Sequence, residues 1–492
     1  MLGAASVPRP DFTDRRTRLA LGITVIGALA AGLIYAVGTG DWRLTAYVSA
    51  VAIAPALLVL ALKRSYLFPY GIYVALIPFD NMLKIAGSGT LTKMLGILST
   101  AFIVIYAFRR KGLNAPPLSL YLWLTYLAWL LLSLLWSADV ANGILDAQVT
   151  VSLIGMFAVL AVAPVDERDL RAICACIVLG GVASSFYGIY LLHDAPTIET
   201  IGGQAGRLMI NVDNRTIDAN HFANAMLTPI ALAMVAMLNS RKLRTILGAL
   251  FALIVLLAGE AVALSREAML ACIVIVAITV FFSRRRALGI ALFGGMIALV
   301  PLLVPAIFSR ITDALATGGA GRTSIWETGW TAFKLHPVIG WGAGGAIEAY
   351  DRTYLKVFQA YNAGWSRPPH NTPLQVMVEL GVIGFVLFGA AFIATFRHFR
   401  GIPRTSSLYD LKIAFTAALI GLAVCSLFIG LETYKYVWVA LATTAQLRTV
   451  ARSQQRRPQP AIVYEPPPAA PAPARSRARA RRDRPPLSAP AS

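Results

Sequence analysis

Apolar segments of about 20 residues recur along this chain from Leu19 to about Val450. A helix of about that length crosses a hydrocarbon core of about 30 Å, and in lipid it pairs its own backbone polar groups. The mean hydropathy is +0.66 and only 14% of the 492 residues are charged, which excludes an ordinary soluble protein. The alternating ten-residue pattern of a membrane barrel does not occur. The sequence therefore predicts an all-α polytopic membrane protein.

Hydropathy gives fourteen candidate spans, at 19–37, 44–62, 66–80, 91–108, 118–136, 148–164, 170–192, 219–238, 244–263, 267–283, 287–308, 372–396, 410–430 and 434–449. The third is interrupted by Pro69 and Pro78, and the last is flanked by Lys435. Both are compatible with re-entrant or interfacial segments. We therefore expect about 12 transmembrane helices, within a range of about 12 to 14. An even number places both ends of the chain on the same side of the membrane.

Basic residues gather in short connections that fall on one side under this count. They are Lys63-Arg64, Arg109-Arg110-Lys111, Arg241-Lys242-Arg244, Arg284-Arg285-Arg286 and Arg397-Arg400-Arg404. Lys and Arg are retained in the cytoplasm, so this side and both termini are predicted to be cytoplasmic. The formal charge of +20 is then a topology signal, and no nucleic-acid partner is expected.

These boundaries predict five regions. They are a cytoplasmic N-terminus at 1–18, a transmembrane bundle at 19–308, a large non-cytoplasmic loop with amphipathic helices at 309–371, C-terminal transmembrane helices at 372–450, and a disordered Pro/Ala/Arg-rich cytoplasmic tail at 451–492. The tail carries nine arginines against Glu465 and Asp483. These arginines either lie against anionic lipid headgroups or only fix the topology.

The large loop has helical patterns of its own. Thr323 to Leu335 is compatible with a helix that ends where His336-Pro337 forbids its continuation. Ala346 to Ala360 is amphipathic, with Ile347, Tyr350, Tyr354, Leu355 and Phe358 on its apolar face. A glycine-rich turn lies between the two. Pro369 to Pro373 begins the next helix, which places His370 at a helix start.

Four polar groups fall on the non-cytoplasmic side: Asn214-Arg215, Ser265-Arg266, Gly321-Arg322 and His370-Asn371. Several arginines from separate elements suit an anion such as a diphosphate, which a guanidinium binds through two oxygens. The alternatives are that Arg266 is an interfacial arginine that reaches to headgroups, and that Arg215 pairs with a nearby aspartate.

His370 is the group on this face that exchanges protons near neutral pH, so it is a candidate general base for an acceptor hydroxyl. Alternatively, it only hydrogen-bonds to the backbone. His336 is a weaker candidate with a role in shaping the loop. Trp326 stacks on sugar or, as we favour, lies at headgroup level. The four cysteines lie in apolar runs, and no carboxylates cluster on this face, so neither a metal nor a cofactor is expected.

The order of these motifs resembles the O-antigen ligase and polymerase superfamily, and within it the O-antigen ligases. The motifs are Asn220-His221-Phe222-Ala223, Leu264-Ser265-Arg266, Gly321-Arg322 with Trp326, His336-Pro337 with Gly340 and Gly342, and His370-Asn371 followed by Glu379-Leu380-Gly381. The resemblance covers roughly 210 to 385 in motif terms. Elsewhere it is limited to hydropathy and the position of the large loop.

This resemblance implies a metal-independent glycosyltransferase of the bacterial inner membrane, with the layout of the polyprenyl-dependent membrane glycosyltransferases. Such ligases move O-antigen from undecaprenyl diphosphate to the lipid A-core oligosaccharide at the periplasmic face. The family's essential histidine best matches His370 and its loop arginine Arg322. Its other essential arginine matches Arg215 or Arg266. The alternatives are an O-antigen polymerase, a protein O-oligosaccharyltransferase and, from another class, a lipid-linked glycan transporter.

Metal independence is directly testable. We expect glycan transfer by the purified protein to persist in EDTA, because fixed arginines neutralise the leaving diphosphate without a cation. Activity that disappears in EDTA and returns with Mg²⁺ would contradict this expectation.

Overall fold

The computed structural model describes residues 54, 57–80, 83–85, 89–110, 112–194, 210–212, 215–217, 219–303, 322–357 and 366–456. The first candidate span, most of the second, and Asn214 lie outside these residues. So does most of the predicted tail.

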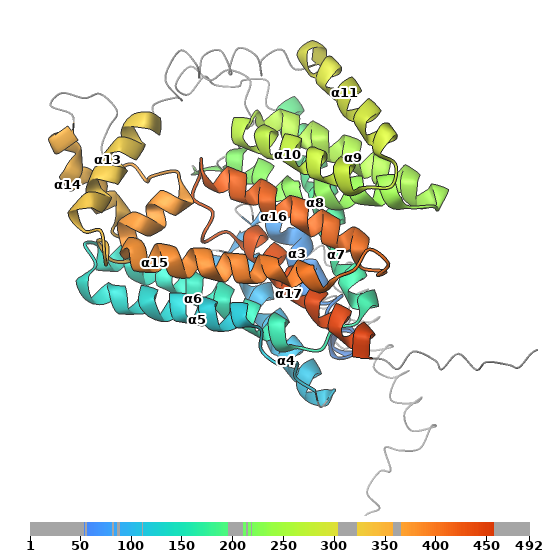
Figure 1. Ribbon diagram of the computed structural model, residues 1–492, viewed down its shortest axis with the longest axis horizontal. Helices are drawn as coiled ribbons and strands as arrows, with labels where there is room; N and C mark the ends of the chain where they lie inside the picture. Colours follow the sequence, from blue (N-terminus) through green and yellow to red (C-terminus); the bar gives the residue numbers. More distant parts are fainter. Residues whose placement is uncertain are drawn as a thin grey trace, which may run out of the picture.

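Helices make up most of the described chain (Figure 1). They are α3 (Tyr70–Leu76), α4 (Leu91–Arg109), α5 (Leu118–Ser133), α6 (Val140–Val162), α7 (Glu167–Asp194), α8 (Ala219–Asn239), α9 (Leu243–Ala263), α10 (Arg266–Phe282), α11 (Arg286–Leu303), α13 (Arg322–Leu335), α14 (Ala346–Val357), α15 (Thr372–Phe396), α16 (Tyr409–Ser426) and α17 (Lys435–Arg456). Two short antiparallel hairpins pair β1 (Lys84–Ile85) with β2 (Gly89–Thr90), and β3 (Ile210–Val212) with β4 (Arg215–Ile217).

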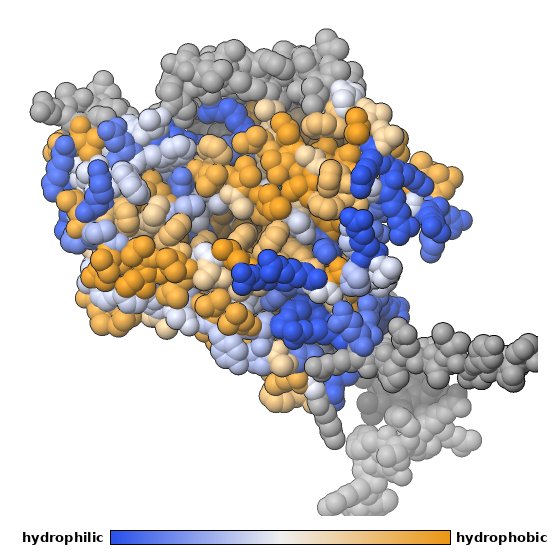
Figure 2. Space-filling model, in the orientation of Figure 1, coloured by the Kyte–Doolittle hydropathy of each residue, from blue (hydrophilic) through white to orange (hydrophobic). Residues whose placement is uncertain are grey.

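Within the described residues, eight helices are long and apolar enough to cross a membrane. The chain is therefore a multi-pass membrane protein whose described part is helical apart from the two short hairpins. Helix α8 is the central one: 89% of its apolar window is buried, against 28–56% for the other seven. The neighbouring helices each have one side that is exposed and apolar, as expected for contact with lipid. Phe251 on α9 and Ile273 on α10 are examples. Figure 2 shows apolar side chains covering the middle of this face, with hydrophilic ones towards its two ends.

The two weak candidate spans are not among the eight. The segment at 66–80 contains only α3, of seven residues, followed by the 3₁₀ turn η1 (Ile77–Phe79). Neither is long enough to cross a bilayer as a single helix, so a regular spanning helix is not confirmed here. The segment nevertheless runs from the Pro164 carbonyl, which accepts from the Tyr66 hydroxyl at 3.0 Å, to the ion pair of Asp80 with Lys435 at 2.7 Å. Helix α17 covers 434–449 but runs on to Arg456 and is polar in its last turns. The first residues assigned to a disordered tail are therefore helical.

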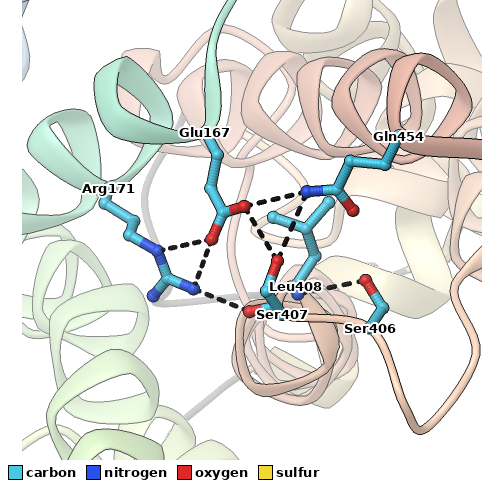
Figure 3. Close-up of polar contacts among 6 residues, drawn as sticks. All are labelled: Glu167, Arg171, Ser406, Ser407, Leu408 and Gln454. Carbon is cyan, nitrogen blue, oxygen red and sulfur yellow. Dashed lines mark hydrogen bonds and ion pairs between the residues drawn. The ribbon is translucent and has the colours of Figure 1, made fainter. Parts of the chain in front are cut away.

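The basic connections meet at one end of the bundle, as the alternation of spans predicts. Asn239 at the end of α8 accepts a hydrogen bond from the Arg284 backbone at 2.9 Å and donates one to Asp410 of α16 at 2.9 Å. Figure 3 shows Glu167 of α7 at the centre of a second cluster at this end. Glu167 accepts from Arg171 at 2.7 Å, and from Ser407 and Gln454 at 2.8 Å each. These contacts fasten α7 and α17 to the connection before α16.

Helices α13 and α14 cover the opposite end of the bundle (Figure 1). The prediction of α13 is confirmed, including its end before His336-Pro337. The side chains of the predicted apolar face of α14 differ in exposure. Tyr350 and Tyr354 are buried, but Leu355 is 61% exposed. Small residues occupy the contact instead: Ala332 of α13 packs with Ala346 and Ala349 of α14. Close approach of the two helices selects alanine there over larger apolar residues.

Helix α15 is not the single span predicted for 372–396. Gly381 has φ 66° and ψ −169°, which divides α15 into two arms, 372–380 and 382–396. A Cβ placed on Gly384 would lie 2.1 Å from the Cβ of Leu380, whereas residues four apart in a helix have Cβ atoms about 5–6 Å apart. Thr372 and Gly389 also line the same groove, although a straight helix would separate them by about 25 Å. The chain therefore doubles back at Gly381.

The loop at 337–342 pairs with the backbone groups that this break releases. The amides of Trp341 and Gly342 donate to the carbonyls of Val378 and Glu379, at 2.9 and 2.8 Å. The amide of Val382 donates to Pro337 at 2.9 Å. The Trp129 ring of α5 donates to the Leu380 carbonyl at 3.0 Å. The break is therefore hydrogen-bonded on both of its sides, as backbone within a membrane protein must be.

Gly381→Ala tests the break. An alanine Cβ would lie 2.1 Å from the Val338 carbonyl oxygen, in a backbone conformation that costs a non-glycine residue about 1–3 kcal/mol. We expect a lower temperature of unfolding and a loss of transfer activity. Gly155→Ala in α6 is the matched control, because no atom lies within 4 Å of its Cβ position and it does not line the groove. Equal unfolding temperatures for the two variants would contradict the described turn.

Candidate active site

One face of α13 connects two of the predicted polar groups. Arg322 and Trp326 are four residues apart, so their side chains lie on the same side of the helix. The Arg322 Nη2 lies 3.7 Å from Oε1 of Glu267 in the first turn of α10. The Trp326 Nε1 donates to the Pro369 carbonyl at 3.1 Å. Helix α13 therefore contacts both Glu267, which follows Arg266, and Pro369, which precedes His370.

The connection between α9 and α10 holds Arg266 at a defined position. Leu264 has a left-handed backbone with φ 48°, and the hydroxyl of Ser265 then caps α10 by accepting from the Ala268 amide at 3.4 Å. Ala263 and Ala268, on either side of the turn, pack in one cluster with Phe222 of α8. This packing fixes the strained leucine and makes Arg266 the first residue of α10.

His370 has the same local arrangement. Its φ is 48°, and Asn371 caps α15 by accepting from the Leu374 amide at 2.9 Å. The Asn371 amide group also donates to the Leu427 carbonyl at 2.9 Å. The Thr372 hydroxyl donates to Ile429 at 3.0 Å and accepts from the Leu431 amide at 2.8 Å. The backbone on both sides of His370 is therefore held, which is common where strain serves a function.

The connection between α16 and α17 contacts the first turn of α8 through His221. The ring of Tyr434 stacks on His221, with ring centres 3.7 Å apart, and Nδ1 of His221 lies 3.2 Å from the Tyr436 hydroxyl. Next to Tyr434, Lys435 binds both carboxylate oxygens of Asp80, at 2.7 and 2.8 Å. His221 was expected only as part of a motif, because its aromatic partners are distant in the sequence.

An apolar groove of about 280 Å³ begins directly below Thr372. Its lining is Trp123, Thr372, Pro373, Phe385, Phe388, Gly389, Phe392, Ile393, Leu422, Ala423, Ser426, Leu431, Glu432, Val437, Trp438 and Leu441. Both arms of α15 contribute to it. Burial raises the pKa of the Glu432 carboxyl, and a hydrogen bond with Thr372 acts in the opposite direction. The groove therefore has apolar walls and includes Thr372, two residues after His370.

The structure groups most, but not all, of the predicted residues. Arg322, Trp326, His370 and Asn371 belong to one connected set, which reaches Arg266 through Glu267. For Arg215 the structure describes only the backbone, in β4. His336 is exposed and packs edge-on against Trp341 at 4.6 Å, which fits a shaping role in the loop. In the described part of the chain, no group of three or more His, Cys, Asp or Glu residues is placed to hold a metal.

These features define a multi-pass membrane protein in which α13 links the start of α10 to the segment that carries His370, at the end opposite the basic connections. Residues 251–389 match the family model described as O-antigen ligase. The matched region includes Arg266, Arg322 and His370, but not Arg215. The match supports the resemblance to the O-antigen ligase superfamily over this region of the chain. A comparison with curated proteins found no match.

Asn371 offers a test of how the site is held. Asn371→Ala removes both the helix cap and the bond to Leu427, which should lower the free energy of unfolding by about 1–2 kcal/mol. Asn371→Asp keeps an acceptor for the cap and loses the amide donor. We therefore expect unfolding temperatures in the order wild type, Asp variant, Ala variant, with transfer activity reduced in both variants. Wild-type activity in the alanine variant would show that the position of His370 does not depend on this cap.

Proposed function

We propose that this protein is an O-antigen ligase. It would transfer O-antigen polysaccharide from undecaprenyl diphosphate to the lipid A-core oligosaccharide at the periplasmic face of the bacterial inner membrane, with both termini cytoplasmic. The observation that carries this proposal is the position of α13, which brings Arg322 to the α10 turn and Trp326 to the His370 segment. The family match supports a ligase or polymerase type of glycosyltransferase.

Arg322 and Arg266 are suited to the donor diphosphate. Each is the first residue of its helix, α13 and α10, where backbone N–H groups and the helix dipole favour an anion. Guanidinium groups remain charged and bind two phosphate oxygens at once. As the sugar–phosphate bond breaks, negative charge grows on the diphosphate, so fixed positive groups stabilise the transition state. Arg215 is proposed as a third contact.

His370 is suited to the acceptor. As general base it would take the proton from the attacking hydroxyl of the core sugar. The hydroxyl oxygen then forms the bond to the anomeric carbon, and the carbon–oxygen bond to the diphosphate breaks with its electron pair. Attack from the side opposite the leaving group inverts the anomeric centre. His336, Asn371, Trp326 and Asn214 are secondary candidates for contacts around this reaction.

The apolar groove supports a lipid-linked substrate. Its lining is hydrocarbon apart from a few groups around Thr372 and Glu432, at the end nearest His370. Burial of apolar chain in such a groove is favourable by about 0.8 kcal/mol per methylene. A lipid tail held there would place its polar headgroup near the polar residues at the start of α15.

The family match also fits the alternatives of an O-antigen polymerase or a protein O-oligosaccharyltransferase. Deletion of the gene discriminates, because a ligase mutant accumulates polymer on the carrier lipid and a polymerase mutant leaves single units on lipid A-core. Broken helices are typical of transporters, so the break in α15 keeps a lipid-linked glycan transporter as a less favoured alternative. Transfer of labelled glycan in detergent, with no compartment to cross, would exclude transport as the sole activity.

The proposed site predicts the outcome of four substitutions. We expect His370→Ala and Arg322→Ala each to lower ligation by about 10²-fold or more and to abolish the O-antigen ladder on a lipopolysaccharide gel. Lys334→Ala and Arg352→Ala are the matched controls, because Lys334 is exposed in the last turn of α13 and Arg352 forms an exposed ion pair with Glu348. Normal ladders from His370→Ala or Arg322→Ala, at wild-type protein abundance, would refute the assignment.

A further inference from the structure

Glu267 is a buried carboxylate beside the proposed diphosphate site, and the mechanism does not use it. Its side chain is 4% exposed, whereas that of Arg322 is 20% exposed. Its Oε1 makes no hydrogen bond to any residue that the structure describes, and the 3.7 Å contact with Arg322 is longer than a hydrogen bond. The carboxylate is therefore enclosed, while the guanidinium lies on the more open side of the pair.

Glu267 occupies a position that favours negative charge. It follows Arg266 in the first turn of α10, so the dipole of that helix stabilises its carboxylate. A second fixed contact holds its backbone, since the Cys425 thiol donates to the Glu267 carbonyl at 3.4 Å. A diphosphate that binds Arg322 would have to approach the Glu267 carboxylate and replace it as the partner of the guanidinium.

We propose that Glu267 is a positioning residue that holds Arg322 when the site is empty and competes with the diphosphate for it. This inference rests on the proposed function. Transfer converts a diphosphate diester into a monoester, which gains a further ionisable oxygen and binds an arginine clamp more tightly than the donor does. The nearby carboxylate repels that additional charge. Glu267 therefore weakens binding of the polyprenyl diphosphate product and speeds its release.

The test compares wild type, Glu267→Gln and Glu267→Asp as full-length proteins in lipid nanodiscs. Glutamine keeps the size of the side chain and removes its charge. We expect Glu267→Gln to bind undecaprenyl diphosphate and inorganic diphosphate about 5- to 50-fold more tightly than wild type, with a lower donor KM and a lower kcat. Glu267→Asp, which retracts the charge by one methylene, should be intermediate. Glu348→Gln removes the exposed carboxylate that pairs with Arg352 and should match wild type.

The outcomes separate this inference from the proposed function. Binding by Glu267→Gln that is equal to or weaker than wild-type binding, with a raised donor KM, would show that Glu267 only orients Arg322 and would overturn the competition. Failure of the wild type itself to bind either diphosphate would overturn the proposed function and this inference together. If the unfolding temperature shows that Glu267→Gln does not fold, Glu267→Asp provides the test. Tighter diphosphate binding than in wild type supports the competition, and equal or weaker binding overturns it.

Discussion

The candidate site depends on one backbone constraint, the reversal of α15 at Gly381. A helix that stops inside a membrane protein releases carbonyl and amide groups, and each costs several kcal/mol if it stays unpaired away from water. Here the 337–342 loop and Trp129 pair with those groups on both sides of the break. The loop must therefore lie against α15, and the helices on either side of it, α13 and α14, are located by the same contacts. The hydrogen bond from Trp326 to the Pro369 carbonyl then fixes α13 directly beside the His370 segment.

The two turns that carry the proposed chemistry are built alike. At Leu264 and at His370 a left-handed residue is followed by a side chain that caps the next helix. The capping bonds fix where each helix begins, and so the direction of its dipole. Polar groups whose positions are fixed before substrate binds need no reorganisation during the reaction, which is the main source of electrostatic catalysis. Helix α13 then joins the two turns through Arg322 and Trp326, so a change at either turn reaches the other through a single rigid element.

Local signals predicted much of this from the sequence. Hydropathy identified the spanning helices. The distribution of Lys and Arg predicted that the basic connections lie at one end. His336-Pro337 predicted the end of α13. Pro369 and Pro373 placed His370 at a helix start. The break could not be predicted, because the segment around Gly381 is apolar enough to score as one span and hydropathy is insensitive to φ. The contacts of Glu267 with Arg322 and of His221 with Tyr434 join residues that are distant in sequence, and only the packing of the helices brings them together. The contact of α14 with α13 through Ala346, Ala349 and Ala332 likewise depends on the close approach of two helices.

The groove under Thr372 shows why the reversal matters for a lipid substrate. A straight α15 would place its first residue at the outer surface, about 25 Å from Gly389, and would leave Thr372 no part in an internal groove. The doubled helix instead brings its first turn inside the bundle, next to Phe388 and Trp438. The proposed base and an apolar lateral groove then adjoin each other through Thr372 and Glu432. A substrate whose reacting headgroup is bonded to a long hydrocarbon tail needs this adjacency, because its tail stays in the bilayer while its headgroup reaches the polar end of the bundle.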